Sequence, residues 1–267
     1  MAEHDLIKVT LPDGSVREYP AGVSMLEIAK DISPRLAREA LAAKVDGRLV
    51  NLSAPLDRDA RVEILTFDDE EGRQVYRHST AHVMAQAVQR LFPGTGLAIG
   101  PAIADGFYYD FDPKESFTPE DLAKIEKEME AIIKADLPFE RFELSRPEAL
   151  AFFRDAGQKY KVELIEDLPP DVPLSCYRQG EFVDLCMGPH VPSTGRLKSV
   201  KLLNLAGAYW RGNEKNKILQ RIYGTSFPKK SLLDEYLFRI EEAKRRDHRK
   251  LEAELDLFSI REEGPGF

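Results

Sequence analysis

Alternating hydrophobic and polar positions mark out a small unit in residues 1–67. Two alternating stretches, LIKVTL and SVREY, flank a Pro-Asp-Gly sequence at 12–14 that is typical of a hairpin turn. Ser24 and Glu27 have the spacing of a capping box, which predicts that a helix begins at MLEIAKDI. LAAKV, RLVNL and ARVEILTF follow as predicted strands. We therefore expect a short sheet with one or two helices on one face.

Residues 68–230 alternate between helical and strand-like patterns. HSTAHVMAQAVQRLF is predicted as a helix with one apolar arc and both histidines at its edge, and further helices are predicted to begin after the capping residues Thr118 and Ser145. AIADGFYYDFD and CYRQGEFVDLC are predicted as hairpins, and KYKVELIEDL and KILQRIYGTSF as strands. The acidic stretch DDEEG at 68–72 is predicted as a linker. The mixture predicts an α+β fold with two domains.

From residue 231 the chain has the composition of one long charged helix, SLLDEYLFRIEEAKRRDHRKLEAELDLF. Such a helix is typical of a connector. The stretch SIREEGPGF then ends without a domain of its own, so we expect the chain to be a piece of a longer protein.

Composition places the protein among globular chains. Its 267 residues exceed one ordinary domain, and 43% of them are hydrophobic and 31% charged. No run approaches the roughly 20 apolar residues of a membrane span, and the first residues lack a signal peptide's basic and apolar regions. We therefore expect a cytoplasmic protein without a membrane partner. Its two cysteines, Cys176 and Cys186, are expected to be reduced there, so either is available as a ligand or reactive group.

Charge is unevenly distributed. The net charge is −8, yet residues 196–230 hold nine lysines and arginines against one acid, Glu214. This stretch is either a solvated surface or a stripe that faces phosphates. No G-x-x-x-x-G-K-[ST] motif is present, so no P-loop nucleotide site is expected.

Two pairs of side chains carry the candidate chemistry. His78 and His82 are four residues apart and project from one face of their helix, while Cys186 and His190 lie just past a predicted strand. Together they form a plausible tetrahedral zinc set, although no H-E-x-x-H signature is present. A hydrolytic site without metal and a structural role for the histidines are the alternatives. The residues alone leave the choice open.

The motifs resemble the N-terminal half of bacterial threonyl-tRNA synthetases. The resemblance is carried by HSTAHVMAQAVQRLFPGTGLAIGPAIADGFYYDFD, by FVDLCMGPHVPSTG and by DHRKLEAELDLFSIREEGPGF, and it covers the whole chain. It implies a TGS domain of ubiquitin-like β-grasp shape at 1–67. An editing domain, of the fold shared by threonyl- and alanyl-tRNA synthetases, is implied at 68–230. The resemblance further implies a linker helix at 231–260, followed by the start of a truncated class II catalytic domain at 261–267.

This resemblance implies hydrolysis of seryl-tRNA(Thr), formed when serine is charged in place of threonine. The implied catalytic residues are His78, His82, Lys161, Cys186 and His190. The implied substrate-binding residues are Asp184 and Tyr109, the latter on one strand face with Phe107 and Phe111. The basic residues expected to contact the tRNA acceptor arm are Lys198, Lys201, Arg211, Lys215 and Lys217.

The roles follow from the chemistry of an aminoacyl ester. One imidazole and Lys161 are expected to orient the attacking water and the leaving ribose oxygen, and Asp184 to bind the serine ammonium or hydroxyl. Cys186 is expected to position groups or limit size rather than to attack as a thiolate. Editing is expected without metal, with His78, His82, Cys186 and His190 as the alternative zinc set.

The resemblance also implies what is missing. ATP, the zinc of the amino-acid site and the main dimer interface belong to the absent catalytic domain. We therefore expect a monomer that does not charge tRNA, from a homodimeric parent enzyme. The alternatives are a zinc-dependent or free-standing aminoacyl-tRNA deacylase, and a non-catalytic RNA-binding module.

Overall fold

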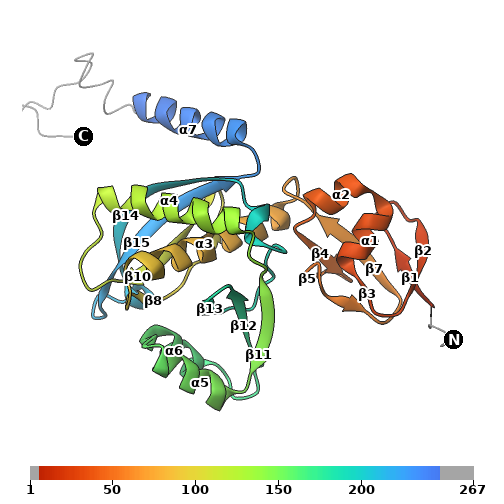
Figure 1. Cartoon of the computed structure of the whole chain (residues 1–267), viewed down its shortest axis with the longest axis horizontal. Helices are drawn as coiled ribbons and strands as arrows, with labels where there is room; N and C mark the ends of the chain where they lie inside the picture. Colours follow the sequence, from red (N-terminus) through yellow and green to blue (C-terminus); the bar gives the residue numbers. More distant parts are fainter. Residues whose placement is uncertain (1–5, 247–267) are drawn as a thin grey trace, which may run out of the picture.

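The computed structural model describes residues 6–246 (Figure 1). The expected α+β class is confirmed: a small N-terminal unit packs beside a larger unit, and a last helix leads away from both. The predicted continuation of that helix to residue 260 and the segment 261–267 lie outside the described residues.

The N-terminal unit is a mixed sheet with two helices on one face, as the β-grasp expectation required. Its strand order is β2-β1-β7-β4-β5, in which β1 and β7 are parallel. The strands are β1 (Leu6–Thr10), β2 (Val16–Pro20), β4 (Ala42–Val45), β5 (Arg48–Val50) and β7 (Ala60–Leu65), with the separate pair β3 (Val23–Ser24) and β6 (Pro55–Leu56). The helices are α1 (Met25–Ile32) and α2 (Pro34–Glu39). The capping box of Ser24 and Glu27 is present at the start of α1.

The larger unit is built around a sheet of order β14-β15-β10-β8, with β9 paired to β10. Its strands are β8 (Gly96–Leu97), β9 (Ala102–Ile103), β10 (Gly106–Asp112), β14 (Ser199–Tyr209) and β15 (Ile218–Phe227). The helices α3 (Glu70–Leu91) and α4 (Pro119–Ala135) pack against it and against each other. Short 3-10 turns cover Thr194–Arg196 and Trp210–Gly212.

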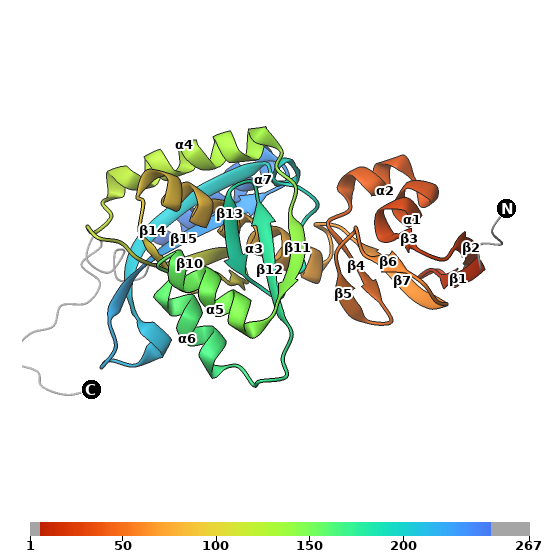
Figure 2. The same ribbon diagram turned by 60° about the horizontal axis from the view of Figure 1, so that its bottom comes forward.

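A second, smaller sheet closes the other side of α3 (Figure 2). It consists of β11 (Glu140–Leu144), β12 (Leu174–Gln179) and β13 (Phe182–Leu185). Its outer face carries α5 (Arg146–Asp155) and α6 (Lys159–Asp167). The predicted hairpin CYRQGEFVDLC is confirmed as β12 and β13.

The strand prediction for KYKVELIEDL is wrong, because this stretch forms α6. Its buried residues include Lys161 and Ile165, four positions apart, and the two therefore share one face of a helix. Tyr160 and Leu164 repeat that spacing and pack against Trp210. Polar and apolar residues alternate over part of this stretch, as they do in a strand. The side chains that are buried by other elements, however, have the spacing of a helix.

The linker prediction for DDEEG is also wrong. Asp69 is the N-cap of α3, and Glu70 and Glu71 form its first turn. Acidic side chains stabilise this end of a helix because its free N–H groups carry partial positive charge. The chain has no room for a spacer here, since a Cβ added at Gly72 would lie 1.8 Å from the carbonyl oxygen of Thr66.

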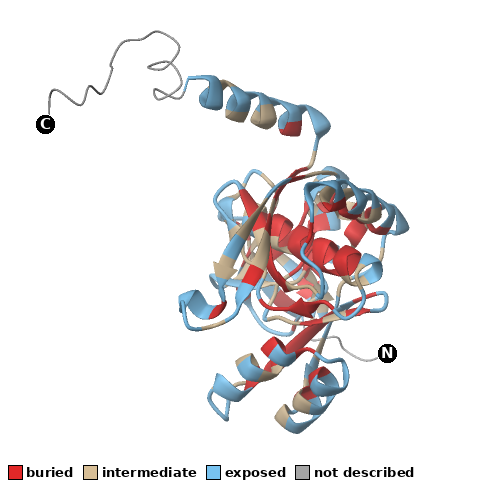
Figure 3. Cartoon of the chain, turned by 90° about the vertical axis from the view of Figure 1, so that its left-hand side faces the viewer, coloured by how far each residue is buried: buried red, intermediate tan, exposed pale blue. Residues whose placement is uncertain are grey.

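α3 is buried on nearly all sides, so the expected single apolar arc is wrong (Figure 3). Ser79, Thr80 and Gln86 are buried with the apolar residues, because two sheets and α4 enclose the helix. Ser79 and Thr80 donate to carbonyl oxygens of their own helix, at 2.8 and 2.9 Å. Short hydroxyls make this burial tolerable, since their donors are satisfied without solvent.

The last helix, α7 (Lys230–Arg245), is the exposed counterpart of α3 (Figure 3). Only Leu233 is buried within it, so this described part of the predicted connector makes few contacts with the body of the protein. Across residues 6–246, no helix has both the length and the apolar character that crossing a membrane requires.

Candidate active site

Three structural elements bring the predicted catalytic residues together: two of them form a cluster of three histidines and Cys186, and the third supplies Lys161 beside it. His78 and His82 come from α3, Cys186 and His190 from the loop after β13, and Lys161 from α6. One ligating atom from each histidine and from Cys186 lies within 4.8 Å of all the others. The joint placement of the two sequence pairs is therefore confirmed.

The ring of His78 has a defined tautomer. Its Nδ1 lies 3.0 Å from the carbonyl oxygen of Gly100, which can only accept a hydrogen bond, so Nδ1 carries the proton. In the neutral ring Nε2 is then an acceptor, 3.0 Å from Sγ of Cys186. Burial lowers the pKa of His78, which favours this neutral form.

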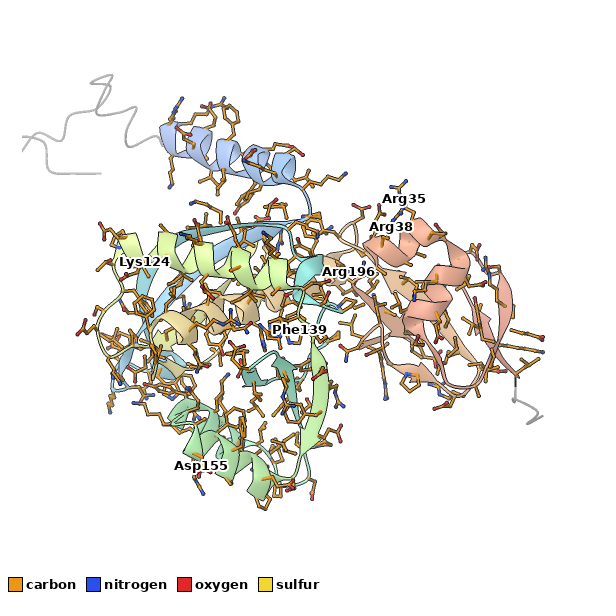
Figure 4. The ribbon with its side chains drawn as sticks, in the orientation of Figure 1. Arg35, Arg38, Lys124, Phe139, Asp155 and Arg196 are labelled. Atoms are coloured by element: carbon orange, nitrogen blue, oxygen red, sulfur yellow. The ribbon has the colours of Figure 1, made fainter. Side chains whose placement is uncertain are left out.

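The same argument assigns the tautomer of His190. The Ser79 hydroxyl donates its proton to the carbonyl of Val75, so at 3.0 Å it accepts from Nδ1–H of His190. Nε2 of His190 is then bare and lies 3.4 Å from Sγ of Cys186. The ring stacks on Phe139, with centroids 4.8 Å apart and an interplanar angle of 4°. In Figure 4, Phe139 lies just before β11, on the side of the larger unit that faces the N-terminal unit.

Cys186 faces both bare nitrogens. Burial raises the pKa of its thiol to about 12, although the Gly188 N–H donates to Sγ at 3.2 Å and opposes that shift. At neutral pH the group is a thiol, with one proton for two acceptors. A strongly nucleophilic thiolate is therefore not the resting form of this side chain.

His82 is buried, and Nδ1 has no hydrogen-bond partner among the described residues. Its Nε2 lies 3.8 Å from Oδ2 of Asp184. Burial, followed by the neighbouring charges of His78 and Lys161, holds its pKa well below the ordinary value. An unpartnered buried nitrogen costs stability, so it marks a place where function and packing conflict.

The donor set of the cluster fits a metal ion. Neutral imidazole nitrogens and a cysteine thiolate are ligand types that zinc prefers, so Cys186 would lose its proton on binding the metal. A modest inward shift would bring them to the roughly 3.3–3.8 Å mutual spacing of tetrahedral ligands with bonds of about 2.0–2.3 Å.

Lys161, Asp184 and Tyr109 form a separate network beneath the cluster. The ammonium Nζ lies 2.6 Å from Oδ1 of Asp184, and the Tyr109 hydroxyl donates to Oδ2 at 2.6 Å. Lys161 also donates to the Tyr109 oxygen at 3.1 Å. All three side chains are buried, and burial next to Asp184 raises the pKa of Tyr109 well above its ordinary value.

In this network the two residues predicted to bind substrate, Asp184 and Tyr109, are occupied by contacts within the protein. Asp184 is only 1% exposed; its Oδ2 accepts from Tyr109, and its Oδ1 has no described hydrogen bond but is held by the close ion pair with Lys161. In this conformation Asp184 is therefore closed to a serine ammonium. Tyr109 is fully buried and stacks on Phe111 at 4.9 Å, as its shared strand face predicted. Their direct contact with a substrate stays a prediction that requires the network to open.

A pocket opens onto the cluster from one side. It is lined by Leu49, Gln74, Val75, His78, Pro101, Ala102, Gly188 and Pro189. His78 is the one predicted catalytic residue in this lining. A ligand in the pocket would therefore meet His78 first, with Cys186 and His190 behind it.

Sequence reasoning missed several residues that support the site. Ser79 fixes the tautomer of His190, the Gly100 carbonyl fixes that of His78, and Phe139 stacks on His190. Asn51, from the N-terminal unit, accepts a hydrogen bond from the His190 backbone. No local pattern could identify them, because each acts through a residue distant in sequence.

The predicted tRNA-binding residues are less free than their sequence suggested. Lys201 pairs with Glu126 at 3.0 Å, Lys217 with Asp112 at 2.5 Å, and Arg211 with Asp167. Lys198 donates to the carbonyl of Gly195, and Lys215 is exposed with no ion pair among the described residues. Acids from other elements thus neutralise much of the basic stretch.

A second group of cations lies at the junction of the two units (Figure 4). Arg35 and Arg38 of α2 lie close to Arg196, whose guanidinium donates to the carbonyls of Ala37 and Arg38. Together with Lys198 and Lys229 they line a pocket between α2 and the start of α7. The contact of the predicted residues with RNA stays a prediction.

Each of the two units contains a match to a known domain family. Residues 7–66 match the TGS domain, and residues 174–223 match the threonyl and alanyl tRNA synthetase second additional domain. Over 98% of its length the chain is 70% identical to a threonine–tRNA ligase of Desulforamulus reducens and 65% identical to one of Carboxydothermus hydrogenoformans. It spans 41% of the length of each of these relatives. The chain therefore belongs to the threonine–tRNA ligase family, with the TGS domain and second additional domain of its N-terminal region.

Proposed function

We propose that the site hydrolyses the aminoacyl ester of tRNA(Thr) that carries serine by mistake. The observation that carries the proposal is the bare Nε2 of His78, a neutral base beside a pocket and backed by the Cys186 thiol. The cytoplasm, where tRNA is charged, is the compartment in which we propose that it acts.

In this proposal a water attacks the ester carbonyl and gives its proton to His78 Nε2. The carbonyl–ribose bond then breaks, and the ribose oxygen leaves with a proton, which restores the neutral imidazole. A base must be unprotonated at neutral pH, and burial of His78 favours that state. The protonated thiol of Cys186 fits a positioning or size-limiting role better than nucleophilic attack.

Lys161 supports this chemistry from behind the cluster. Its charge is held against Asp184 and Tyr109 rather than in the pocket lining. In this arrangement it stabilises developing negative charge through the low-dielectric interior and holds β13, the strand that leads into the loop with Cys186 and His190. Direct contact with the water or ribose oxygen would require Nζ to leave Tyr109.

Proofreading explains why such a site is needed beside a threonine-specific ligase. Serine lacks one methyl group of threonine, a difference worth roughly 1–3 kcal/mol in a binding pocket. A second site that admits serine and excludes threonine multiplies the discrimination. Part of the pocket that contains His78 is lined by the compact residues Ala102, Gly188 and Pro189, which suits a role in size selection.

Editing without a metal ion is part of the proposal. A zinc-dependent deacylase is the second candidate, because His78, His82, Cys186 and His190 supply a complete donor set. To act in hydrolysis, zinc bound there would need one of the four positions open for a water, whose pKa it would lower to about 7. In either case His78 and His190 must keep their present tautomers, so Gly100 and Ser79 matter to both candidates.

The decisive experiment is deacylation of seryl- and threonyl-tRNA(Thr) by the purified chain, with and without a strong chelator. We expect loss of serine at least tenfold faster than loss of threonine and unaffected by chelator. His78→Ala should reduce this rate at least 100-fold. Gln89→Ala, about three turns along the same helix, is the matched control and should leave the rate unchanged.

Other outcomes contradict parts of the proposal. Loss of activity with chelator would favour the zinc candidate. Tight tRNA binding without deacylation would favour the non-catalytic RNA-binding module. Ligation of threonine to tRNA with ATP is proposed only for a whole protein that also has a catalytic domain, and we expect none from this chain.

A further inference from the structure

Asn51 belongs to the N-terminal unit, yet its side chain is bound to the catalytic loop of the larger unit. It follows β5 directly. Its Oδ1 accepts from the backbone N–H of His190 at 3.1 Å, and its Nδ2 donates to the hydroxyl oxygen of Tyr177 at 2.9 Å. One half-buried amide thus connects the two units at the residue that carries a predicted catalytic imidazole.

The loop that Asn51 holds has few other anchors between Cys186 and His190. Cys186 is tied to β12 at one end, through its N–H to the Ser175 carbonyl at 3.0 Å and its carbonyl to the Ser175 hydroxyl at 2.7 Å. Val191 is tied to α3 at the other end, through Ser79 at 3.1 Å. Met187 between them is 86% exposed. The bond to Asn51 fixes the backbone of His190 within this span.

Tyr177 transmits the position of Asn51 to the site. Its ring lies edge-on to His190, with centroids 4.4 Å apart. Its hydroxyl sits directly under Gly188, where an added Cβ would come within 2.0 Å of that oxygen. A shift of the Tyr177 hydroxyl would therefore move both Gly188 and the His190 ring.

The N-terminal unit also supplies a wall of the pocket. Leu49, two residues before Asn51, lines the pocket together with His78, Gly188 and Pro189. The two units are fixed at further points: Lys44 pairs with Glu71, and Leu41 and Ala42 pack in the core of the larger unit. The pocket is thus incomplete without the N-terminal unit.

We propose that Asn51 is a positioning residue for the hydrolytic site, so that the TGS domain is a structural part of that site. This inference rests on the proposed function. An amide suits the place because it presents an acceptor to His190 N–H and a donor to Tyr177 at once. Loss of the amide frees the loop and misplaces His190 and Cys186 relative to His78.

The test compares Asn51→Ala and Asn51→Asp with the wild-type chain. Aspartate keeps an acceptor for His190 N–H, and its second oxygen can accept from the Tyr177 hydroxyl. Ser53→Ala is the matched control, since Ser53 is exposed in the same turn and no described hydrogen bond involves its side chain. Thermal unfolding of each variant establishes that it is folded.

The first readout does not depend on catalysis. The alkylation rate of Cys186, resolved from buried Cys176 by peptide mass spectrometry, reports how tightly the loop is held. We expect Asn51→Ala to raise it at least threefold and to speed amide exchange in residues 185–192. Asn51→Asp should stay close to wild type, and Ser53→Ala should not differ from it.

The second readout is seryl-tRNA(Thr) deacylation. We expect Asn51→Ala to lower kcat about tenfold with KM changed less than twofold, because a lost hydrogen bond misplaces the reacting groups without removing tRNA contacts. Asn51→Asp should restore most of kcat. A change in alkylation with no deacylation by the wild-type chain would refute the proposed function and leave the positioning role standing. Equal behaviour of Asn51→Ala and Ser53→Ala in both readouts would overturn the inference.

Discussion

The imidazole–thiol cluster and the lysine–carboxylate network lie side by side but differ in how completely their polar atoms are paired. In the network, Lys161, Asp184 and Tyr109 engage one another at 2.6–3.1 Å. In the cluster, two bare ring nitrogens share one thiol proton, and Nδ1 of His82 has no described partner. Paired groups stabilise a fold, whereas unpaired groups in a buried place are available for chemistry.

The largest effect is expected in the network. Asp184→Asn leaves the ammonium of Lys161 buried without its counter-charge, so the free energy of unfolding should fall by about 3–5 kcal/mol. Urea titration measures this change. Glu143→Gln, which breaks the exposed pair with Arg141, is the control and should cost less than about 1 kcal/mol. Similar losses for both variants would remove the distinction between buried and exposed pairs.

A smaller loss is expected from Gly188→Ala in the loop of the cluster. The residue has φ +71°, and the added Cβ would lie 2.0 Å from the Tyr177 hydroxyl oxygen. We expect a destabilisation of about 2–3 kcal/mol in chemical denaturation. Gly212→Ala, with φ +66° but open space around the Cβ, should cost only about 1 kcal/mol, so the difference isolates the contact with Tyr177.

The variant His82→Leu tests whether a residue of the cluster contributes to activity without contributing to stability. The leucine removes the unpartnered Nδ1 from a buried position, so the free energy of unfolding should change by less than about 1 kcal/mol, in either direction. Deacylation of seryl-tRNA should nevertheless fall at least tenfold. Circular dichroism melts and the deacylation assay on one preparation test both statements. A large loss of stability would show that His82 serves the fold rather than the chemistry.

The smallest effect is expected from Glu181 at the surface. Its ion pair with Arg90 lowers the pKa of the carboxyl from 4.5 to about 2. The lowered pKa means that the stabilisation is fully present above about pH 4.5 and is lost as the pH falls toward 2. Because Glu181 is exposed, we expect about 1 kcal/mol or less at pH 7. The stability difference between the wild-type chain and Glu181→Gln, measured from pH 7 to 2.5, should shrink toward zero.

Local signals along the chain were sufficient for many elements. The capping boxes at Ser24, Thr118 and Ser145 each begin a helix where expected. The hairpins and the four-residue spacing within each of the two pairs, His78 with His82 and Cys186 with His190, were also predicted. Capping boxes, tight turns and such spacings involve residues close together in the sequence, so a short stretch of sequence is enough to predict them.

Tertiary contacts decided the rest. KYKVELIEDL became a helix because Tyr160, Lys161 and Ile165 are buried from that side, and its helical form is what brings Lys161 to Asp184. Four of the nine cations in the basic stretch at 196–230 pair with acids from distant elements, as Lys201 does with Glu126.

The sequence by itself determined which side chains could do chemistry, because residue type and short spacing set what each group can donate, accept or ligate. Only the tertiary structure decided their states. The tautomers of His78 and His190 depend on Gly100 and Ser79, and the place of the loop depends on Asn51, more than 130 residues before His190. Such contacts join residues far apart in sequence, and burial then shifts each pKa by an amount that no local pattern contains.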